Sequence, residues 1–282
     1  MNRSGLNIEE IKSVIDYALK EDIGSGDITT NSLIPLDLQA KATMVAKSTG
    51  VIAGLAVAEC VFRSLSNDIN WKALVRDGDR VSKGDLILEI SGSYRALLTG
   101  ERVALNFLQR MSGIATMTSN YVDLVKDYKA NILDTRKTAP GLRLLDKYAV
   151  MTGGGRNHRI GLYDMVLIKD NHIKIAGGIT RAVAQIKTNL PKGIKIEVET
   201  TTVEEVNEAL AAGVDVIMLD NMSNTQMAQC VKIINGRTKV EASGNMTSQR
   251  LKEVAETGVD FISIGALTHS VIAFDISMNI ES

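Results

Sequence analysis

The stretch VDVIMLDNMSNTQMAQCVKIINGRTKVEASGNMTSQRLKEVAETGVDFISIGALTH, residues 214–269, decides the fold. It contains three short apolar runs rich in β-branched residues, and each run ends in polar or small residues before an amphipathic segment begins. Such runs predict strands, and apolar residues spaced at i, i+3 and i+4 predict helices. The stretch therefore predicts successive βα units whose strands lie parallel, because a helix separates each strand from the next.

The same unit recurs upstream, so six strands are expected from residue 131 onward. Their starts lie 19 to 33 residues apart, a spacing that suits a strand followed by a helix. No G-x-G-x-x-G fingerprint follows the first strand and no Walker phosphate loop occurs, which disfavours the Rossmann and P-loop folds. We predict an α/β protein with an incomplete or open parallel βα barrel. The six strands are NILDT (131–135), DMVLIKD (164–170), KIEVET (195–200), VDVIMLDN (214–221), KVEASG (239–244) and VDFISIGA (259–266).

Residues 1–112 follow a different pattern, which predicts an α+β, sandwich-like domain. An amphipathic helix is followed by short strands separated by D-G-D and K-G-D turns. The segment VRDGDRVSKGDLILEI (75–90) resembles half of a biotinyl or lipoyl carrier, but no hairpin lysine for modification is evident, so we interpret it as scaffold. Residues 100–129 predict one long helix leading into a barrel domain at 113–273. The tail, about 274–282, is expected to pack back on the first domain.

Composition excludes several classes of protein. The 282 residues are 45% hydrophobic, which is ample for a core, and the formal charge of -1 provides no overall field for nucleic acid or anionic lipid. Cys60 and Cys230 stand in no paired motif, which argues against a disulfide scaffold or a structural zinc site and favours the cytoplasm. We also expect no secretory signal and no membrane span, because the charge-free runs are too short.

Catalytic groups of a parallel βα barrel come from the carboxyl ends of its strands. Exposed strand ends are often simply polar, but the whole set found here is rich in charged and small residues, which favours a ligand site. The strand-end residues are Asp134, Thr135, Arg136, Lys137, Lys169, Asp170, Glu199, Asp220, Asn221, Ser243, Gly244, Gly265 and Ala266.

A local excess of positive charge indicates an anionic ligand. Residues 136–174 contain eight Lys and Arg but three acidic residues. Arginine binds carboxylate or phosphate through a planar fork, and lysine adds a point charge. A solvated basic helix face is the alternative. The segment GGGRNHR (153–159) weakens that alternative. Its three glycines make the backbone flexible, and two arginines and a histidine follow directly, which is typical of a ligand-binding loop.

Metal and phosphate sites are predicted at the strand ends. Metal binding by His158, His172 and His269 is weakly supported, and His172 is more easily interpreted as structural. Glu199 and Asp220 end consecutive strands and suit Mg²⁺ or sugar hydroxyls, although Asp220 would also suit a helix cap. The segments EASGNMT (241–247) and SIGALTH (263–269) each place a glycine and a hydroxyl residue before a helix, as barrel phosphate sites do.

Several blocks together resemble the quinolinate phosphoribosyltransferase family, which makes nicotinate mononucleotide in NAD synthesis. The resemblance spans nearly the whole chain, in order, and the R-N-H-R and L-I-K-D-N-H-I blocks are its most specific parts. Asn245 stands where the family often has a second glycine, and asparagine tolerates positive φ. The blocks are TGERVALNFLQRMSG (99–113), ILDTRKTAPGLR (132–143), GGGRNHRIGLYDMVLIKDNHI (153–173), IEVET (196–200), VIMLDN (216–221), VEASGN (240–245) and ISIGALTHS (262–270).

The resemblance implies a condensation of quinolinate with 5-phosphoribosyl-1-pyrophosphate that releases pyrophosphate and carbon dioxide and needs Mg²⁺. It implies that Arg136, His158, Arg159 and Lys169 hold the quinolinate carboxylates. Lys137 would meet the pyrophosphate, while Glu199 and Asp220 would meet the ribose hydroxyls and the metal. Lys137, Lys169, Glu199 and Asp220 are the expected catalytic residues, and the 5-phosphate and remaining substrate contacts are expected from Thr135, Ser243, Gly244, Gly265 and His269.

A homodimer and the absence of an organic cofactor are further expectations. Arg102 on the long helix would reach the partner subunit's site, and a higher assembly such as a hexamer is left open. No organic cofactor is expected, because the positively charged pyridinium nitrogen formed in the reaction is itself the electron sink that the loss of carbon dioxide needs.

Three alternatives stand beside this hypothesis. One is a paralogue found with molybdate-transport systems, a group that lacks the R-N-H-R block. Another is a sugar-phosphate aldolase or isomerase in which Lys169 forms a Schiff base, disfavoured by the extra domain and the nearby arginines. The last is a non-catalytic anion-binding regulator, disfavoured by Glu199 and Asp220.

Overall fold

The computed structural model describes residues 6–281, which form two compact units. The first unit comprises the chain up to residue 119 together with 138–154 and the part from 268 onward, and the second comprises 120–137 and 155–267. The long predicted helix is observed as α4 (Tyr94–Val125), which begins in the first unit and ends in the second. The chain therefore passes between the units several times.

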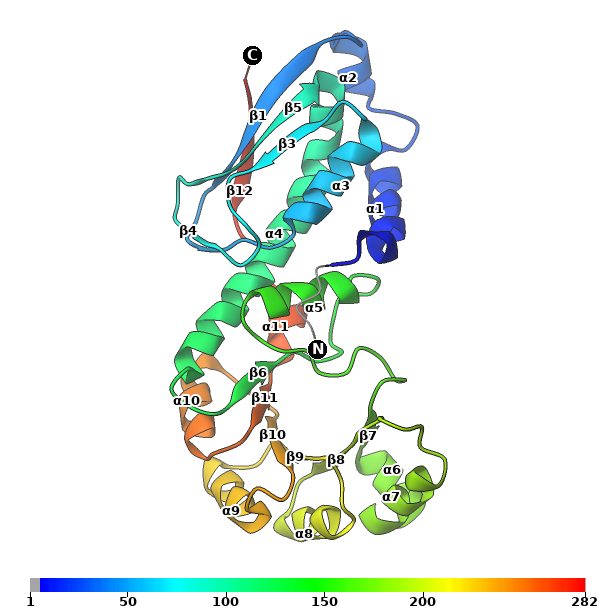
Figure 1. Ribbon diagram of the computed structural model, residues 1–282, viewed down its shortest axis with the longest axis vertical. Helices are drawn as coiled ribbons and strands as arrows, with labels where there is room; N and C mark the ends of the chain where they lie inside the picture. The colour runs from blue at the N-terminus through cyan, green and yellow to red at the C-terminus, as the bar shows by residue number, and fades with distance from the viewer. Residues whose placement is uncertain (1–5, 282) are drawn as a thin grey trace. The chain divides into compact units, whose positions relative to one another are not determined.

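The first unit is built on an antiparallel sheet with strand order β12-β1-β5-β3. Strand β1 (Gln39–Ala46) pairs on one side with β5 (Leu86–Ser93) and on the other with β12 (Ile276–Glu281), so that Met44 lies opposite both Leu88 and Met278. The carboxyl-terminal strand thus completes a sheet whose other strands come from the first hundred residues, as Figure 1 shows for β12 beside β1. The remaining strands of this unit are β2 (Gly50–Val51), β3 (Asn70–Ala73) and β4 (Arg80–Val81).

Helices of the first unit bury regular apolar stripes. In α1 (Ile8–Ile23) the buried residues follow a spacing of four, and Asn7 caps the first turn by accepting the amide of Glu9. A side chain at Gly100 of α4 would collide with Phe62 of α3 (Leu55–Leu65), which explains the glycine there. The other helices are α2 (Ile28–Leu33) and α5 (Arg143–Thr152).

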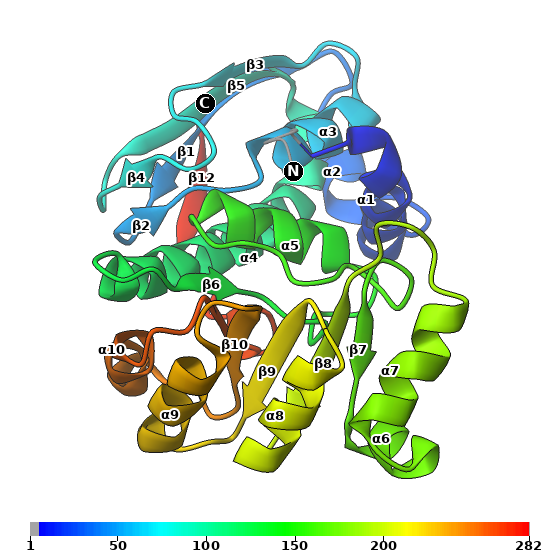
Figure 2. The same cartoon turned by 60° about the horizontal axis from the view of Figure 1, so that its bottom comes forward.

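The second unit contains the six predicted parallel strands, in the order β6-β11-β10-β9-β8-β7. Within the described residues no ladder joins the two edge strands, β6 and β7, so the barrel is open and the predicted fold class is confirmed. Figure 2 shows β7 to β10 side by side with α8 and α9 along one face. The strands are β6 (Asn131–Leu133), β7 (Val166–Ile168), β8 (Ile196–Thr200), β9 (Val216–Asp220), β10 (Lys239–Ser243) and β11 (Phe261–Ser263).

The two faces of this parallel sheet differ in chemistry. One face is apolar and carries fully buried residues such as Val198, Ile217 and Ala242. Since side chains alternate along a strand, the intervening positions Glu197, Glu199 and Glu241 point to the other face. That face is the interior of the open barrel. The helices of this unit are α6 (Asp170–Ala176), α7 (Ile179–Thr188), α8 (Val203–Ala211), α9 (Asn224–Ile234) and α10 (Ser248–Glu256), and α11 (Ala266–His269) follows β11.

Capping side chains start the helices that follow the strands. Thr202 accepts the amide of Glu205 at the start of α8, and Ser223 accepts that of Gln226 at the start of α9, each completing a capping box. Ser223 is therefore the N-cap of α9, and the alternative interpretation of Asp220 as the cap of this helix is wrong. Among residues 6–281 no helix is both long enough and apolar enough to cross a membrane.

Candidate active site

Arg156 to His158, in the predicted ligand-binding loop at 153–159, lie against the edge strand β6. Arg156 forms a parallel bridge with Leu133, and its amide donates to the carbonyl of Ile132 at 2.8 Å. Just beyond β6, Asp134 accepts the amide of His158 at 2.9 Å through Oδ1, and Asp134 is fully buried. The polar loop thus extends the edge of the sheet like an added strand, and the His158 side chain reaches the face that carries Glu197 and Glu241.

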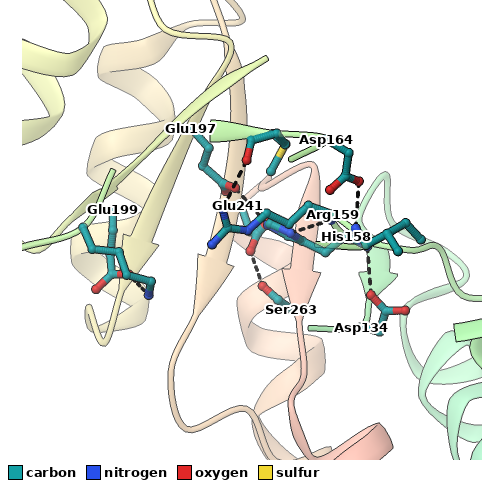
Figure 3. A network of polar contacts seen from close by, with 11 residues as sticks. Asp134, His158, Arg159, Asp164, Glu197, Glu199, Glu241 and Ser263 are labelled. Atoms are coloured by element: carbon teal, nitrogen blue, oxygen red, sulfur yellow. Dashed lines mark hydrogen bonds and ion pairs between the residues drawn. The ribbon is translucent and has the colours of Figure 1, made fainter. Parts of the chain in front are cut away.

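His158 lies at the centre of a buried polar cluster (Figure 3). Its Nε2 atom is 2.8 Å from Oε2 of Glu197 on β8 and 3.6 Å from Oε2 of Glu241 on β10. Its Nδ1 atom accepts the backbone amide of Arg159 at 2.7 Å. Ser263 of β11 donates its hydroxyl to Oε1 of Glu241. Four separate segments of the barrel therefore meet in one hydrogen-bond network.

Burial controls the charge of the two acids in this network. Glu197 is 0% exposed and Glu241 is 1% exposed. Removal from water disfavours the ionised form and raises the pKa of Glu197 to about 7. Burial, together with the neighbouring carboxyl group of Glu197, raises the pKa of Glu241 to about 8. Both shifts favour the neutral form of these carboxyl groups.

Two arginines lie beside this cluster. Burial, reinforced by the positive charge of Arg136, lowers the pKa of Arg159, although a guanidinium remains protonated. Arg159 donates to the carbonyl of Met165 at 3.1 Å. The Nε atom of Arg136 is buried without a hydrogen-bond partner. Two guanidinium groups that repel each other, one with an unused buried donor, are suited to an anion with more than one carboxylate or phosphate group.

Opposite charges meet at the ends of β7 and β8. The ammonium group of Lys169 lies 2.8 Å from Oε2 of Glu199, and both side chains are accessible to solvent. His172 accepts the amide of Lys169 at 3.0 Å at the start of α6, which confirms its structural interpretation. At the end of β9, Oδ2 of Asp220 accepts from the side-chain amide of Asn221 at 2.6 Å.

The predicted phosphate loop after β10 has an unusual backbone. Gly244 and Asn245 both adopt positive φ, at 89° and 48°, so asparagine takes the conformation expected of it. A side chain at Gly244 would collide with Asn221. Arg250 on α10 donates to the carbonyls of Gly244 and Met222, at 3.3 Å and 2.6 Å. The arginine thereby joins the loops after β9 and β10.

The other predicted residues are distributed over both units. In the second unit Thr135 accepts the amide of Lys137, and Ser243 and Gly265 lie at the ends of β10 and β11. In the first unit Arg102 is exposed on α4, and Nδ1 of His269 lies 2.7 Å from the hydroxyl of Ser270. The three histidines have different polar partners. Only His158 belongs to the one cluster within residues 6–281 that has metal-ligand spacing, together with Glu197 and Glu241.

Sequence patterns alone did not single out Glu197, Glu241, Ser263 or Arg250. A signal was present for the two glutamates, because each interrupts an apolar strand two residues before a predicted site residue. Because side chains alternate between the two faces of a strand, each glutamate lies on the same face of the sheet as the predicted site residue and farther from the carboxyl end of the strand. Arg250 gave no comparable signal, because an arginine on an amphipathic helix is ordinarily a solvated residue.

Comparison with known proteins identifies the family. Residues 27–112 match the model for the quinolinate phosphoribosyl transferase N-terminal domain, and residues 114–279 match that for its C-terminal domain. A chloroplastic nicotinate-nucleotide pyrophosphorylase [carboxylating] of Arabidopsis thaliana is 47% identical over 97% of this chain and 83% of its own length. A probable nicotinate-nucleotide pyrophosphorylase [carboxylating] of Synechocystis is 48% identical over 93% of this chain and 90% of its own length.

Solved structures agree with this assignment. NadC from Streptococcus pyogenes superposes with a TM-score of 0.95 at 45% identity, covering 98% of both chains. The nicotinate-nucleotide pyrophosphorylase from Francisella tularensis superposes with a TM-score of 0.94 at 41% identity, again covering 98% of both chains. The family models and these full-length similarities show that this chain belongs to the quinolinate phosphoribosyltransferase family.

Proposed function

We propose that the protein transfers a phosphoribosyl group from 5-phosphoribosyl-1-pyrophosphate to quinolinate and decarboxylates the product. The products are nicotinate mononucleotide, pyrophosphate and carbon dioxide, so the enzyme is a pentosyltransferase of de novo NAD synthesis. Two observations carry the proposal. Arg136 and Arg159 lie close enough to repel each other, and the Nε donor of Arg136 is buried without a partner. Lys169 and Glu199, which carry opposite charges, form an ion pair at the neighbouring strand ends. The two carboxylates of quinolinate would bind to the arginines and Lys169, and the ribose hydroxyls of the phosphoribosyl donor would bind to the acidic side chains.

Quinolinate is assigned to the arginine side of the site. Arg136, Arg159 and Lys169 bind its two carboxylates, and the unsatisfied Nε of Arg136 supplies one donor for this purpose. His158 lines the same wall, but its Nε2 and Nδ1 atoms already face Glu197 and the amide of Arg159. Its direct contact with a carboxylate remains a prediction that competes with these two hydrogen bonds.

The phosphoribosyl donor is assigned to the strand ends of β8 to β11 and to the segment that follows β6. Lys137 binds the pyrophosphate, Glu199 and Asp220 face the ribose hydroxyls, and backbone amides of the loop at Gly244 suit the 5-phosphate. Gly244 and Asn245 both have positive φ, and their backbone amides are the ones we assign to the 5-phosphate. The remaining substrate contacts are assigned to Thr135, Ser243, Gly265 and His269.

The carboxylates of Glu199 and Asp220 also fit Mg²⁺, which prefers oxygen ligands and commonly binds together with substrate phosphates. Mg²⁺ would neutralise charge on the departing pyrophosphate. Glu199 is paired with Lys169, so in the complete complex its carboxylate is shared between an ammonium group, ribose and metal. No organic cofactor is assigned.

The residues act by position and charge. As the bond from the anomeric carbon to pyrophosphate breaks, Glu199 and Asp220 stabilise positive charge on the ribose, and Lys137 stabilises negative charge on the leaving group. Arg136 and Arg159 hold the pyridine ring so that its nitrogen attacks that carbon. When the bond from C2 to its carboxylate breaks, the electron pair stays on C2, where the adjacent positively charged pyridinium nitrogen stabilises it, and a proton then replaces carbon dioxide at C2.

A homodimer completes the proposal. Arg102 is exposed on α4, and we assign it to the partner subunit's site, while assembly beyond a dimer is left open. We assign the protein to the cytoplasm and assign it neither a nucleic-acid nor a membrane partner, since its net charge is -1.

Formation of nicotinate mononucleotide tests the function. Purified protein is incubated with quinolinate, 5-phosphoribosyl-1-pyrophosphate and Mg²⁺, then with each omitted, and then with nicotinate in place of quinolinate. Product that requires all three components and is not formed from nicotinate supports the proposal. Folded protein that binds the phosphoribosyl donor but forms no product from quinolinate favours the paralogue of molybdate-transport systems instead.

A further inference from the structure

We propose that Asn221 and Asn245 are positioning residues that link the carboxylate assigned to the ribose hydroxyls with the loop assigned to the 5-phosphate. The inference rests on the proposed function, in which Asp220 faces the ribose and backbone amides at Gly244 bind the phosphate. It assigns a role to two asparagine side chains that the reaction described above does not use. Both act on the donor through a neighbouring residue rather than on a reacting atom.

Two side-chain hydrogen bonds run in series from the loop after β10 to the end of β9. The Nδ2 atom of Asn245 donates to Oδ1 of Asn221 at 3.2 Å, and Nδ2 of Asn221 donates to Oδ2 of Asp220 at 2.6 Å. Because a carboxylate only accepts hydrogen bonds, the amide nitrogen of Asn221 must face Asp220, and its oxygen must face Asn245. Asn245 in turn must present its own nitrogen. The acceptor at one end therefore fixes the orientation of both amide groups.

The backbone holds both asparagines in an uncommon conformation. Asn221 and Asn245 have positive φ, at 55° and 48°, and among residues 6–281 the only other non-glycine residue with positive φ is Asn235. Asparagine is one of the few side chains that tolerate this conformation. The backbone amide of Asn221 donates to the carbonyl of Ser243 at 3.0 Å, which continues the pairing of β9 with β10 beyond the end of β9. The two asparagines thus lie at adjacent strand ends, where their side chains reach each other.

Gly244 leaves the space that the Asn221 side chain occupies. A β-carbon at Gly244 would collide with the side-chain amide of Asn221 and would lie 3.0 Å from its backbone nitrogen. Arg250 also joins the two loops, through the carbonyls of Met222 and Gly244. Arg250 binds backbone carbonyls, whereas the asparagine link ends on a side chain assigned to substrate.

The link matters because one donor molecule contacts both ends of it. The ribose hydroxyls and the 5-phosphate belong to a single ribose 5-phosphate unit, so the separation of their binding groups has to match the length of that unit. A small displacement of one group weakens the contact that it makes. Asn221 and Asn245 are exposed, and hydrogen bonds between exposed groups contribute modestly. We therefore expect severalfold effects on donor binding rather than loss of activity.

Asn245→Gly removes the link and keeps the backbone, since glycine adopts positive φ readily. Isothermal titration calorimetry with ribose 5-phosphate, without Mg²⁺ or quinolinate, measures binding to the two linked groups alone. We expect the dissociation constant to rise about three- to tenfold. In steady-state kinetics KM for 5-phosphoribosyl-1-pyrophosphate should rise by a similar factor, while KM for quinolinate should change less than about twofold.

Asn235→Gly is the matched control. Asn235 has a φ of 47°, is exposed, and follows α9 in the same unit, so the substitution makes the same chemical change in the same backbone conformation. Both variants add freedom to the unfolded chain and should lower the melting temperature by a similar, small amount. Asn235→Gly should keep wild-type constants for ribose 5-phosphate and for both substrates. Binding weakened equally in both variants would attribute the loss to stability and overturn the link.

A double-mutant cycle distinguishes a link from two independent effects. Asn221→Gly removes both hydrogen bonds, so adding Asn245→Gly to it should weaken ribose 5-phosphate binding by less than about twofold more. Losses in the double variant equal to the product of the two single losses would mean that the side chains act independently, which would also overturn the proposal.

Failure of the inference differs from failure of the proposed function. If wild type forms nicotinate mononucleotide and Asn245→Gly binds ribose 5-phosphate as tightly as wild type, the link is refuted and the function stands. If the variants behave as expected but quinolinate is not turned over, the acceptor assignment fails and the link at the phosphoribosyl donor stands. Wild type that does not bind ribose 5-phosphate would refute the link, whether or not quinolinate is turned over.

Discussion

The ammonium nitrogen of Lys169 lies 2.8 Å from Oε2 of Glu199, across the ends of two neighbouring strands. The side chains are 47% and 17% exposed, and an ion pair so accessible to water stabilises a fold by only about 0–1 kcal/mol. Its importance is therefore chemical. The pair joins a cation assigned to quinolinate with a carboxylate assigned to the phosphoribosyl donor, and so places the two substrates side by side.

Lys169→Ala should lower kcat/KM for quinolinate about 10- to 100-fold, the effect of losing one charged hydrogen bond to substrate. The melting temperature should change little, because the ion pair is exposed. Steady-state kinetics with each substrate varied in turn, and a thermal melt, measure both effects. Lys174→Ala removes an exposed lysine from the following helix and serves as the control, which should behave as wild type. Equal losses in both variants would exclude a specific role for Lys169.

Mixing two inactive variants tests whether Arg102 acts in the partner subunit. Arg102→Ala and Lys169→Ala homodimers are each expected to keep at most about a tenth of wild-type activity. After subunit exchange about half of the dimers are mixed, and each mixed dimer has one of two sites intact, so about a quarter of wild-type activity should return. Exchange itself is verified with differently tagged subunits. Complete exchange with no recovered activity would show that each site is built from a single chain.

Gly244→Ala should impair the phosphoribosyl donor more than quinolinate. The new side chain would meet Asn221 and would also sit at a φ of 89°. A displacement of the loop by a fraction of an ångström should raise KM for 5-phosphoribosyl-1-pyrophosphate about tenfold or more. Gly236→Ala separates the two causes, because Gly236 also has positive φ but has no atom within 4 Å of the added carbon. That control should lose about 1 kcal/mol of stability and keep its KM values.

Asp260 should make the second unit sensitive to acid. Burial alone would raise the pKa of this carboxyl group, but its contacts with Lys239, at 2.9 Å, and with the amide of Val240, at 3.0 Å, lower it. A lowered pKa in the folded state stabilises the protein above the unfolded-state pKa of about 3.9, and that stabilisation disappears as pH falls through the folded-state value. Asp260→Asn should therefore cost about 1 kcal/mol at pH 7 and less near pH 3.

Urea unfolding of wild type and Asp260→Asn at several pH values between 3 and 7 measures this difference. The two curves of unfolding free energy against pH should converge at the acidic end. A constant gap between Asp260→Asn and wild type over the whole range would mean that the carboxylate charge is not what stabilises the fold.

Much of the fold could be predicted from local sequence. The six parallel strands and the long helix were expected from short β-branched runs and amphipathic segments, because those patterns reflect burial within a few neighbouring residues. The helix is shifted at both ends, running from Tyr94 to Val125 where residues 100–129 were expected. Helix ends depend on capping contacts and on the start of the next strand, which periodicity does not reveal.

The site was predicted in part, for a similar reason. Glu199 and Asp220 could be expected at the barrel's functional edge because the carboxyl ends of parallel strands meet there. Asp220 also suited a helix cap, and only the structure shows that Ser223 fills that position. Arg250 could not be anticipated, since its contacts with Gly244 and Met222 depend on how two loops fold back on one helix.

By itself, the sequence determined the order of strands and helices and the charged character of the strand ends, because both follow from the alternation of side chains along a local segment. Only the tertiary structure decided that His158, Glu197 and Glu241 meet in one buried network. His158 and Glu197 are 39 positions apart. Their contact arises because parallel strands and the loop at β6 converge inside the open barrel, where burial raises the pKa of both carboxyl groups.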